Sequence, residues 1–279
     1  MPRRNERWVD KKRNAGEMTR GDSTSPSASP VPGLLAEDER RRVATQFGVD
    51  DDQVVRDHAI SHALAAIAGL ATDDVVFFGG TALSRTLSTD ARLSEDIDLI
   101  AQGDRNKIGD RIEEAITRDL RGTLGNVTFT PRIRDTRHAE PSVLRVGDTT
   151  VQIQLLAARG YPPWPTEIAN IEQRYTDAPP ARLRVLTRPA FVASKLSSWS
   201  DRGAPRDLYD LWALARARAF DSEAAALFAR FGPFTSTSRV RFERIPTEAE
   251  WEAALGHQCV LAVSPHEATR VVTQALNAM

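Results

Sequence analysis

Two aspartates, Asp96 and Asp98, alternate with apolar residues in the segment DIDLI. In a β-strand, side chains two residues apart project from the same face, so this spacing sets the two carboxylates side by side. Adjacent anions repel each other unless a cation lies between them, and Mg²⁺ favours one or two carboxylates together with substrate phosphates. The pair therefore predicts a metal site, for Mg²⁺ or alternatively Mn²⁺, that takes a nucleoside triphosphate (NTP).

A glycine pair and a hydroxyl precede the aspartates at Gly79, Gly80 and Thr81. Glycine lets the backbone approach a phosphate closely, and a helix that begins here offers free N–H groups at its positive end. We expect these residues, with Ser94 from the loop before the aspartates, to bind the nucleotide. Each motif alone is weak, because DxD occurs at solvated strand edges and GG in many turns, but their combination in one unit is specific.

A second polar cluster lies about a hundred residues later, on two predicted helices that each begin at or beside a proline. If these helices pack antiparallel, Lys195 on the first comes close to Asp210 on the second. Lys195 would then contact the nucleotide phosphates, with Asp207 also near the nucleotide and Asp210 as a further acid. The alternative for Lys195 is a solvated helix face, and for Asp207 a carboxylate that balances the helix dipole.

Hydrophobic periodicity predicts the elements that must position these residues. Strands are expected over 75–78, 96–101, 127–133, 143–146 and 149–157, and helices over 36–47, 82–87, 104–121, 189–201, 205–218 and 222–231. The pattern is that of a small mixed sheet with helices, followed by a mainly helical part.

The same hydrophobic periodicity divides the chain into three parts. Residues 1–33 are basic, lack an apolar period and predict a disordered arm. A mixed-sheet domain is expected over 34–160, and a mainly helical domain over 161–279, because GYPPWP at 160–165 interrupts all periodicity.

Composition bounds the class of protein. A hydrophobic fraction of 41% can fill a core, and a net charge of −1 gives no global attraction to nucleic acid. The single cysteine excludes an internal disulfide, and the sequence has neither a membrane-spanning run nor a signal peptide, so we expect a cytoplasmic protein without membrane partners. P-loop, Rossmann and serine-hydrolase motifs do not occur.

Two features leave alternatives open. The strand expected beside the aspartates carries Gln152 and Gln154 where a third carboxylate would complete a two-metal site, which allows a catalytically inactive nucleotide- or RNA-binding module. His58 and His62 are four apart, as zinc ligands can be, but no glutamate or third ligand accompanies them in the sequence. A packed helix face is the preferred interpretation for these histidines.

The segments GGTALSR (79–85) and RLSEDIDL (92–99) resemble the AbiEii/AbiGii-type nucleotidyltransferases, whose mycobacterial relatives are the MenT toxins. A second motif of the family resembles FVASKL (191–196) followed by RDLYDL (206–211). The resemblance covers roughly His58 to Leu214, and the residues outside that range match nothing familiar.

This resemblance implies an α/β (α+β) fold, with a DNA-polymerase-β-like nucleotidyltransferase domain followed by a helical domain. It implies catalytic roles for Asp96, Asp98, Lys195 and Asp210, and a toxin of a type IV toxin–antitoxin or phage-defence system. Such a toxin would transfer nucleotides from an NTP to the 3′ end of tRNA, block translation, and have a cognate AbiEi-like antitoxin encoded nearby. Transfer to a protein hydroxyl or to a small molecule such as an antibiotic stays open.

Overall fold

A computed structural model describes residues 31–70, 73–137 and 140–279. The arm predicted over 1–33 therefore lies outside the described residues except for its last three. Within the described part of the chain, no helix is both long and apolar enough to cross a lipid bilayer.

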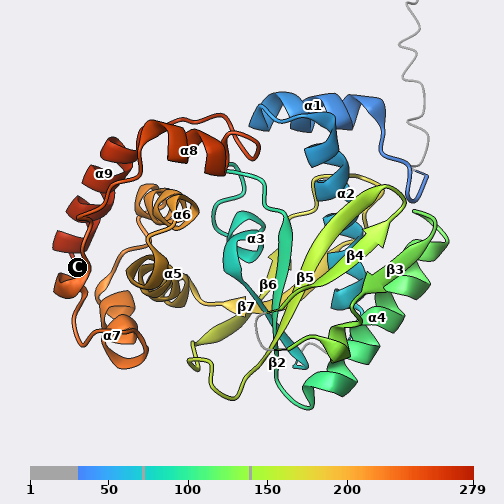
Figure 1. The fold of residues 1–279 in the computed structure, drawn as a ribbon, viewed down its shortest axis with the longest axis horizontal. Helices are drawn as coiled ribbons and strands as arrows, with labels where there is room; N and C mark the ends of the chain where they lie inside the picture. The colour runs from blue at the N-terminus through green and yellow to red at the C-terminus, as the bar shows by residue number, and fades with distance from the viewer. Residues whose placement is uncertain (1–30, 71–72, 138–139) are drawn as a thin grey trace, which may run out of the picture.

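A seven-stranded mixed sheet forms the centre of the molecule, in the order β3-β4-β5-β2-β1-β7-β6 (Figure 1). The strands are β1 (Val75–Phe78), β2 (Asp96–Ala101), β3 (Val127–Thr130), β4 (Ser142–Val146), β5 (Thr149–Ala157), β6 (Thr166–Ile171) and β7 (Ala181–Leu186). β2 pairs antiparallel with β1 and parallel with β5, so the strand with the aspartates lies inside the sheet. The mixed sheet expected from the sequence is confirmed.

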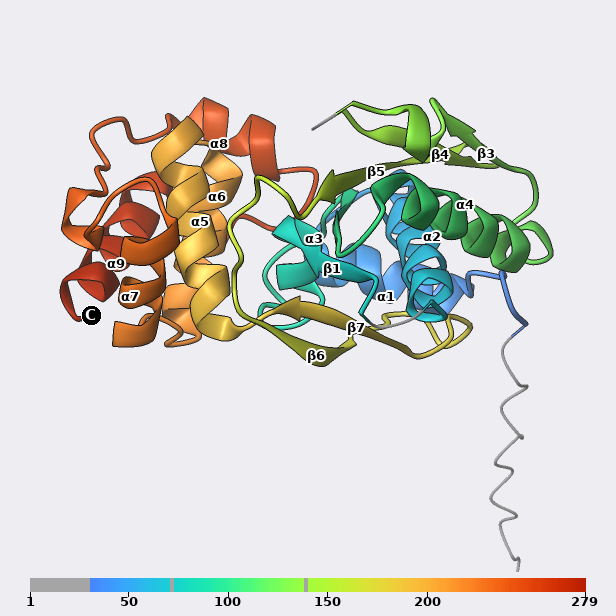
Figure 2. The same ribbon diagram turned by 90° about the horizontal axis from the view of Figure 1, so that it is seen from below.

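Helices cover the sheet and then form a separate stack. They are α1 (Glu37–Phe47), α2 (Asp51–Ala68), α3 (Gly79–Ser84), α4 (Arg105–Arg121), α5 (Arg188–Arg202), α6 (Pro205–Arg216), α7 (Ser222–Phe231), α8 (Glu248–Leu255) and α9 (Pro265–Asn277). α2 and α4 pack on each other and on β5, whereas α5 to α9 gather at one end of the molecule (Figure 2).

The sheet continues past Gly160, into the part of the chain that was expected to be mainly helical, and no strand was expected there from the sequence. β6 and β7 form a hairpin, and β7 pairs parallel with β1. In β7 the side chains of Leu183 and Val185 are buried while Arg182 is exposed. The sequence therefore has the apolar–polar alternation of a half-buried strand, but only over a few residues. The helical part of the chain begins at α5. The division into domains at Gly160 stays a prediction.

Candidate active site

β2 places the two aspartates as their spacing predicted. Ile97 and Leu99 are fully buried in the core, whereas the Asp96 and Asp98 side chains are partly exposed on the opposite face. The strand alternation thus fixes the carboxylate pair on the rigid centre of the sheet.

The glycine turn lies directly against this pair. α3 begins at Gly79, immediately after β1, and Gly79 has a φ of 79°. A Cβ atom at Gly79 would overlap Oδ2 of Asp98, and one at Gly80 would come within 2.5 Å of Arg92 Nη2. Gly79 is therefore required by close approach and by its left-handed backbone, and Gly80 lies close against the Arg92 guanidinium.

Thr81 occupies a different position from the one expected of a phosphate ligand. Its side chain is buried, and its hydroxyl donates a hydrogen bond to the backbone carbonyl of Asp96. The hydroxyl thereby ties α3 to the start of β2.

Burial disfavours the charged form of both carboxyl groups. Burial, with a further contribution from Asp96, raises the pKa of Asp98 to about 6, and burial also raises the pKa of Asp96. Lys195 and two arginines offset only part of this effect. A pair of oxygen donors that is short of positive charge fits a hard divalent cation, so Asp96 and Asp98 are suited to hold Mg²⁺.

Gln152 and Gln154 stand where a third carboxylate would be. In the parallel pairing of β2 with β5, Asp96 is opposite Gln152 and Asp98 is opposite Gln154. The expected position of this strand is confirmed, and so is the absence of an acid on it. Among the described residues that line the cavity around Asp96 and Asp98, Asp207 is the one additional acidic residue.

Lys195 lies in a buried ion cluster between α5 and α6. Its Nζ is 2.6 Å from Asp210 Oδ2 and 3.3 Å from Asp207 Oδ1. The predicted proximity of Lys195 to Asp210 is confirmed. Asp207, in the first turn of α6, is fully buried and accepts two hydrogen bonds from Arg202, at 2.7 and 2.9 Å. Lys195 is likewise buried, so it does not lie on a solvated helix face.

Asp210 is held as an anion by two cations. Arg92 donates to both of its carboxylate oxygens, at 2.8 and 3.0 Å, in the bidentate geometry that planar guanidinium favours. Burial alone would raise the pKa of Asp210, but Arg92 and Lys195 outweigh it and lower the pKa to about 2. Asp210 therefore orients two cations.

A cavity of about 250 Å³ brings the two halves of the site together. Its lining residues come from α3, the loop before β2, β2 itself, the segment before β4, β5, α5 and α6: Gly80, Arg92, Ser94, Asp96, Asp98, Pro141, Gln152, Gln154, Lys195, Arg202, Arg206 and Asp207. Of the residues expected at the site, Gly79, Thr81 and Asp210 are outside this lining and support it.

Several residues at the site were not assigned from the sequence. Arg92 is part of the segment RLSEDIDL, so its place there was a usable signal. Arg202 and Arg206 line the cavity with exposed side chains. No sequence motif pointed to Gln258, because it lies in the segment after α8, far from the other site residues in the sequence.

Gln258 is fully buried and fastens the loop before β2. Its backbone carbonyl accepts from Leu93 N at 2.9 Å, and its side chain accepts from Arg92 Nη1 at 2.8 Å. The side-chain amide donates to Glu95 at 3.0 Å. The C-terminal part of the chain thus fixes the approach to the aspartates.

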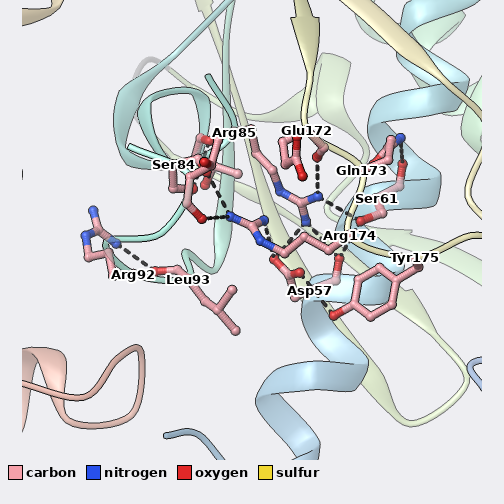
Figure 3. Close-up of polar contacts among 12 residues, drawn as sticks. Asp57, Ser61, Ser84, Arg85, Arg92, Leu93, Glu172, Gln173, Arg174 and Tyr175 are labelled. Atoms are coloured by element: carbon pink, nitrogen blue, oxygen red, sulfur yellow. Dashed lines mark hydrogen bonds and ion pairs between the residues drawn. The ribbon is translucent and has the colours of Figure 1, made fainter. Parts of the chain in front are cut away.

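A buried polar network supports α3 from behind (Figure 3). Arg85, at the end of α3, donates to Asp57 on α2 at 2.7 Å. Arg174, in the connection between β6 and β7, donates to the carbonyl of Ser84 at 2.8 Å, and Tyr175 donates to Asp57 at 3.1 Å. Two distant segments, α2 and the β6–β7 connection, therefore support the position of the glycine turn.

Comparison with solved structures identifies the fold. The chain resembles MenT4, a nucleotidyltransferase toxin from Mycobacterium tuberculosis H37Rv, with a TM-score of 0.63 and 20% identity over 86% of this chain and 90% of that one. A nucleotidyltransferase-like protein of Paracoccidioides brasiliensis aligns with a TM-score of only 0.35, at 14% identity over 70% of this chain and 88% of that one. None of the curated protein sequences compared with the chain matches it.

The family itself is shown by sequence. The model of the nucleotidyl transferase AbiEii toxin family, of type IV toxin–antitoxin systems, matches residues 62–261. The chain belongs to this family and is a nucleotidyltransferase toxin of a type IV system, a class that implies an antitoxin partner. The match extends beyond the range expected from the motifs and includes Gln258.

Proposed function

We propose that this toxin transfers nucleotides from an NTP to the 3′ end of tRNA in a reaction that depends on a divalent cation. The observation that carries the proposal is the Asp96–Asp98 pair, which faces Lys195 across one cavity beside the glycine turn. The cation would be Mg²⁺ held by the pair, where it would neutralise the triphosphate and polarise the α-phosphate.

The protein's own groups position the reactants. The backbone at Gly80 and the Ser94 side chain line the cavity where the phosphates would lie, and Lys195 supplies a positive charge that Asp207 and Asp210 hold in place. The acceptor hydroxyl then loses its proton to solvent and forms a bond to the α-phosphorus, while the bond to the pyrophosphate oxygen breaks and pyrophosphate leaves. Positioning and charge neutralisation account for most of the catalysis in such transfers.

Arginines next to the cavity support a nucleic-acid acceptor. Arg206 has an exposed side chain whose nearest acid, Glu95, is 4.0 Å away. A neighbouring cavity of about 480 Å³ shares Arg202 and adds Arg244. Arg202 is paired with Asp207 and Arg244 with Glu250, so Arg206 is the cation best placed to contact backbone phosphates of an RNA strand whose 3′ end enters the first cavity.

The test is transfer of label from each of the four α-³²P-labelled NTPs to purified tRNA, with total cell protein as a competing acceptor. We expect label on the tRNA 3′ end with Mg²⁺ or Mn²⁺, and a loss of at least about 100-fold in Asp98→Asn. Label on protein or on a small molecule would redirect the proposal to the alternative acceptors. No transfer by a folded wild type that still binds NTP would indicate the inactive module that Gln152 and Gln154 allow.

The cellular consequence is tested by induced expression. Wild type should stop growth, with extended tRNA 3′ ends on sequencing, and co-expression of a neighbouring AbiEi-like gene should restore it. Growth arrest by Asp98→Asn at equal expression would contradict a catalytic origin of toxicity.

A further inference from the structure

Two histidines and an aspartate form a buried cluster outside the active-site cavity. His58 and His62 lie one turn apart on α2, and Asp177 belongs to the connection between β6 and β7. Asp177 Oδ2 is 2.9 Å from His58 Nε2 and 3.0 Å from His62 Nε2, and the two Nε2 atoms are 3.2 Å apart. Asp177 is the third group that the sequence did not reveal.

The three atoms have the spacing of one face of a metal coordination tetrahedron. Bonds of about 2.0–2.1 Å to nitrogen and oxygen separate the ligands of a tetrahedral Zn²⁺ by about 3.3 Å. The observed triangle is close to that size and nearly equilateral. An ion just outside its plane would be within bonding distance of all three atoms.

The surroundings favour an ion over a purely hydrogen-bonded triad. All three side chains are at most 5% exposed, so bulk water does not relieve their mutual contacts. Without an ion, the two Nε2 atoms share one carboxylate oxygen at 2.9 and 3.0 Å while only 3.2 Å apart. An ion would be bound by the lone pairs of all three crowded atoms.

A further contact orients the carboxylate. The backbone N–H of Gly33 donates to Asp177 Oδ2 at 3.0 Å, which is the kind of outer contact that fixes a metal-binding acid. The cluster thus joins three segments: the residues before α1, α2, and the β6–β7 connection.

We propose that His58, His62 and Asp177 bind one Zn²⁺ ion that stabilises the fold, with water as the fourth ligand. Two imidazoles and one carboxylate suit zinc, whereas the all-oxygen pair in the active site suits magnesium. The ion fixes the β6–β7 connection on α2. Arg174 and Tyr175 of that connection then reach α3 and Asp57, so the site stabilises the support of the glycine turn without contacting the nucleotide.

The first test is metal analysis of tag-free protein purified without chelator. We expect about one zinc per chain in wild type, and less than about 0.1 in His62→Gln and in Asp177→Asn. Asp98→Asn and His257→Gln, which alters an exposed histidine, serve as matched controls and should keep the zinc. Zinc that is lost in Asp98→Asn but kept in His62→Gln would overturn the proposal.

The second test needs no variant, so misfolding of a variant cannot obscure it. Chelator-stripped wild type is titrated with Co²⁺, and we expect absorption of tetrahedral Co²⁺ that saturates at one equivalent and is displaced by Zn²⁺. Zinc at about 100 times its dissociation constant should raise Tm by about 5 °C or more. Wild type that holds no zinc, shows no tetrahedral Co²⁺ spectrum and has an unchanged Tm would refute the site.

Discussion

Gly79 shows how the absence of a side chain shapes the site. Replacing it with alanine forces a residue with a Cβ into a φ of 79° and into the space of the Asp98 carboxylate. We expect Gly79→Ala to lower transferase activity by at least about 100-fold and to destabilise the fold by about 1–3 kcal/mol, measured by labelled-NTP transfer and urea unfolding.

Gly147→Ala is the matched control for that change. Gly147 also has a positive φ, of 57°, but its added Cβ would meet nothing within 4 Å. Gly147→Ala should lower the free energy of unfolding by about 1 kcal/mol, because alanine disfavours a positive φ, and should leave transferase activity unchanged. Equal activity of the two variants would contradict the proposed close packing against Asp98.

The raised pKa of Asp98 predicts a pH-dependent stability in metal-free protein. Its pKa is about 6 in the fold against an ordinary 3.8, so folding favours the protonated form. The associated stability is fully present below pH 3.8 and is lost as pH rises through 6. Asp98→Asn avoids this loss.

We therefore expect chelator-treated Asp98→Asn to be more stable than wild type by about 1–3 kcal/mol at pH 7.5, with the difference shrinking toward pH 4. Urea unfolding at both pH values, with chelator present, measures it. A difference that is constant with pH would show that Asp98 titrates normally.

The ion cluster of Arg92, Lys195, Asp207 and Asp210 joins the loop before β2 to helices α5 and α6. Removing one charge of a buried cluster leaves the others uncompensated. Asp210→Asn should therefore destabilise the protein by about 3 kcal/mol and displace Lys195, with a rise in KM for the NTP, as measured by unfolding and steady-state kinetics.

Asp201→Asn is the control, because Asp201 is exposed on α5. It should change stability by less than about 0.5 kcal/mol. If Asp210→Asn kept wild-type stability and lost only kcat, Asp210 would have a direct role at the reacting atoms instead of a positioning role.

The molecule as a whole encloses its site by bringing the C-terminal part back to β2. Gln258 makes three of the contacts that hold the loop of Arg92 to Glu95. We expect Gln258→Ala to reduce kcat/KM about tenfold and to cost about 1 kcal/mol, since it removes one acceptor of the buried Arg92 guanidinium, which keeps Asp210 and the Leu93 carbonyl. Gln274→Ala, at an exposed position on α9, should have no effect. An unchanged kcat/KM in Gln258→Ala would refute this contribution.

The sequence by itself determined the local geometry of the site. Alternation of acids with apolar residues requires Asp96 and Asp98 on one face of a strand, and the adjacent glycines require a tight turn, because strand periodicity and backbone sterics act between neighbours. The two helices predicted from the sequence also bring Lys195 close to Asp210 if they pack antiparallel, and the structure confirms this proximity.

Only the tertiary structure decided which residues from distant parts of the sequence contact one another around the strand and the glycine turn of the site. Gln258 against Arg92, Arg174 against α3, and Asp177 against His58 are contacts between segments more than 80 residues apart. No local period encodes such pairs. They follow from how the sheet, the β6–β7 hairpin and the helical stack pack together, since each buried polar group must find its partner in whatever the fold places beside it.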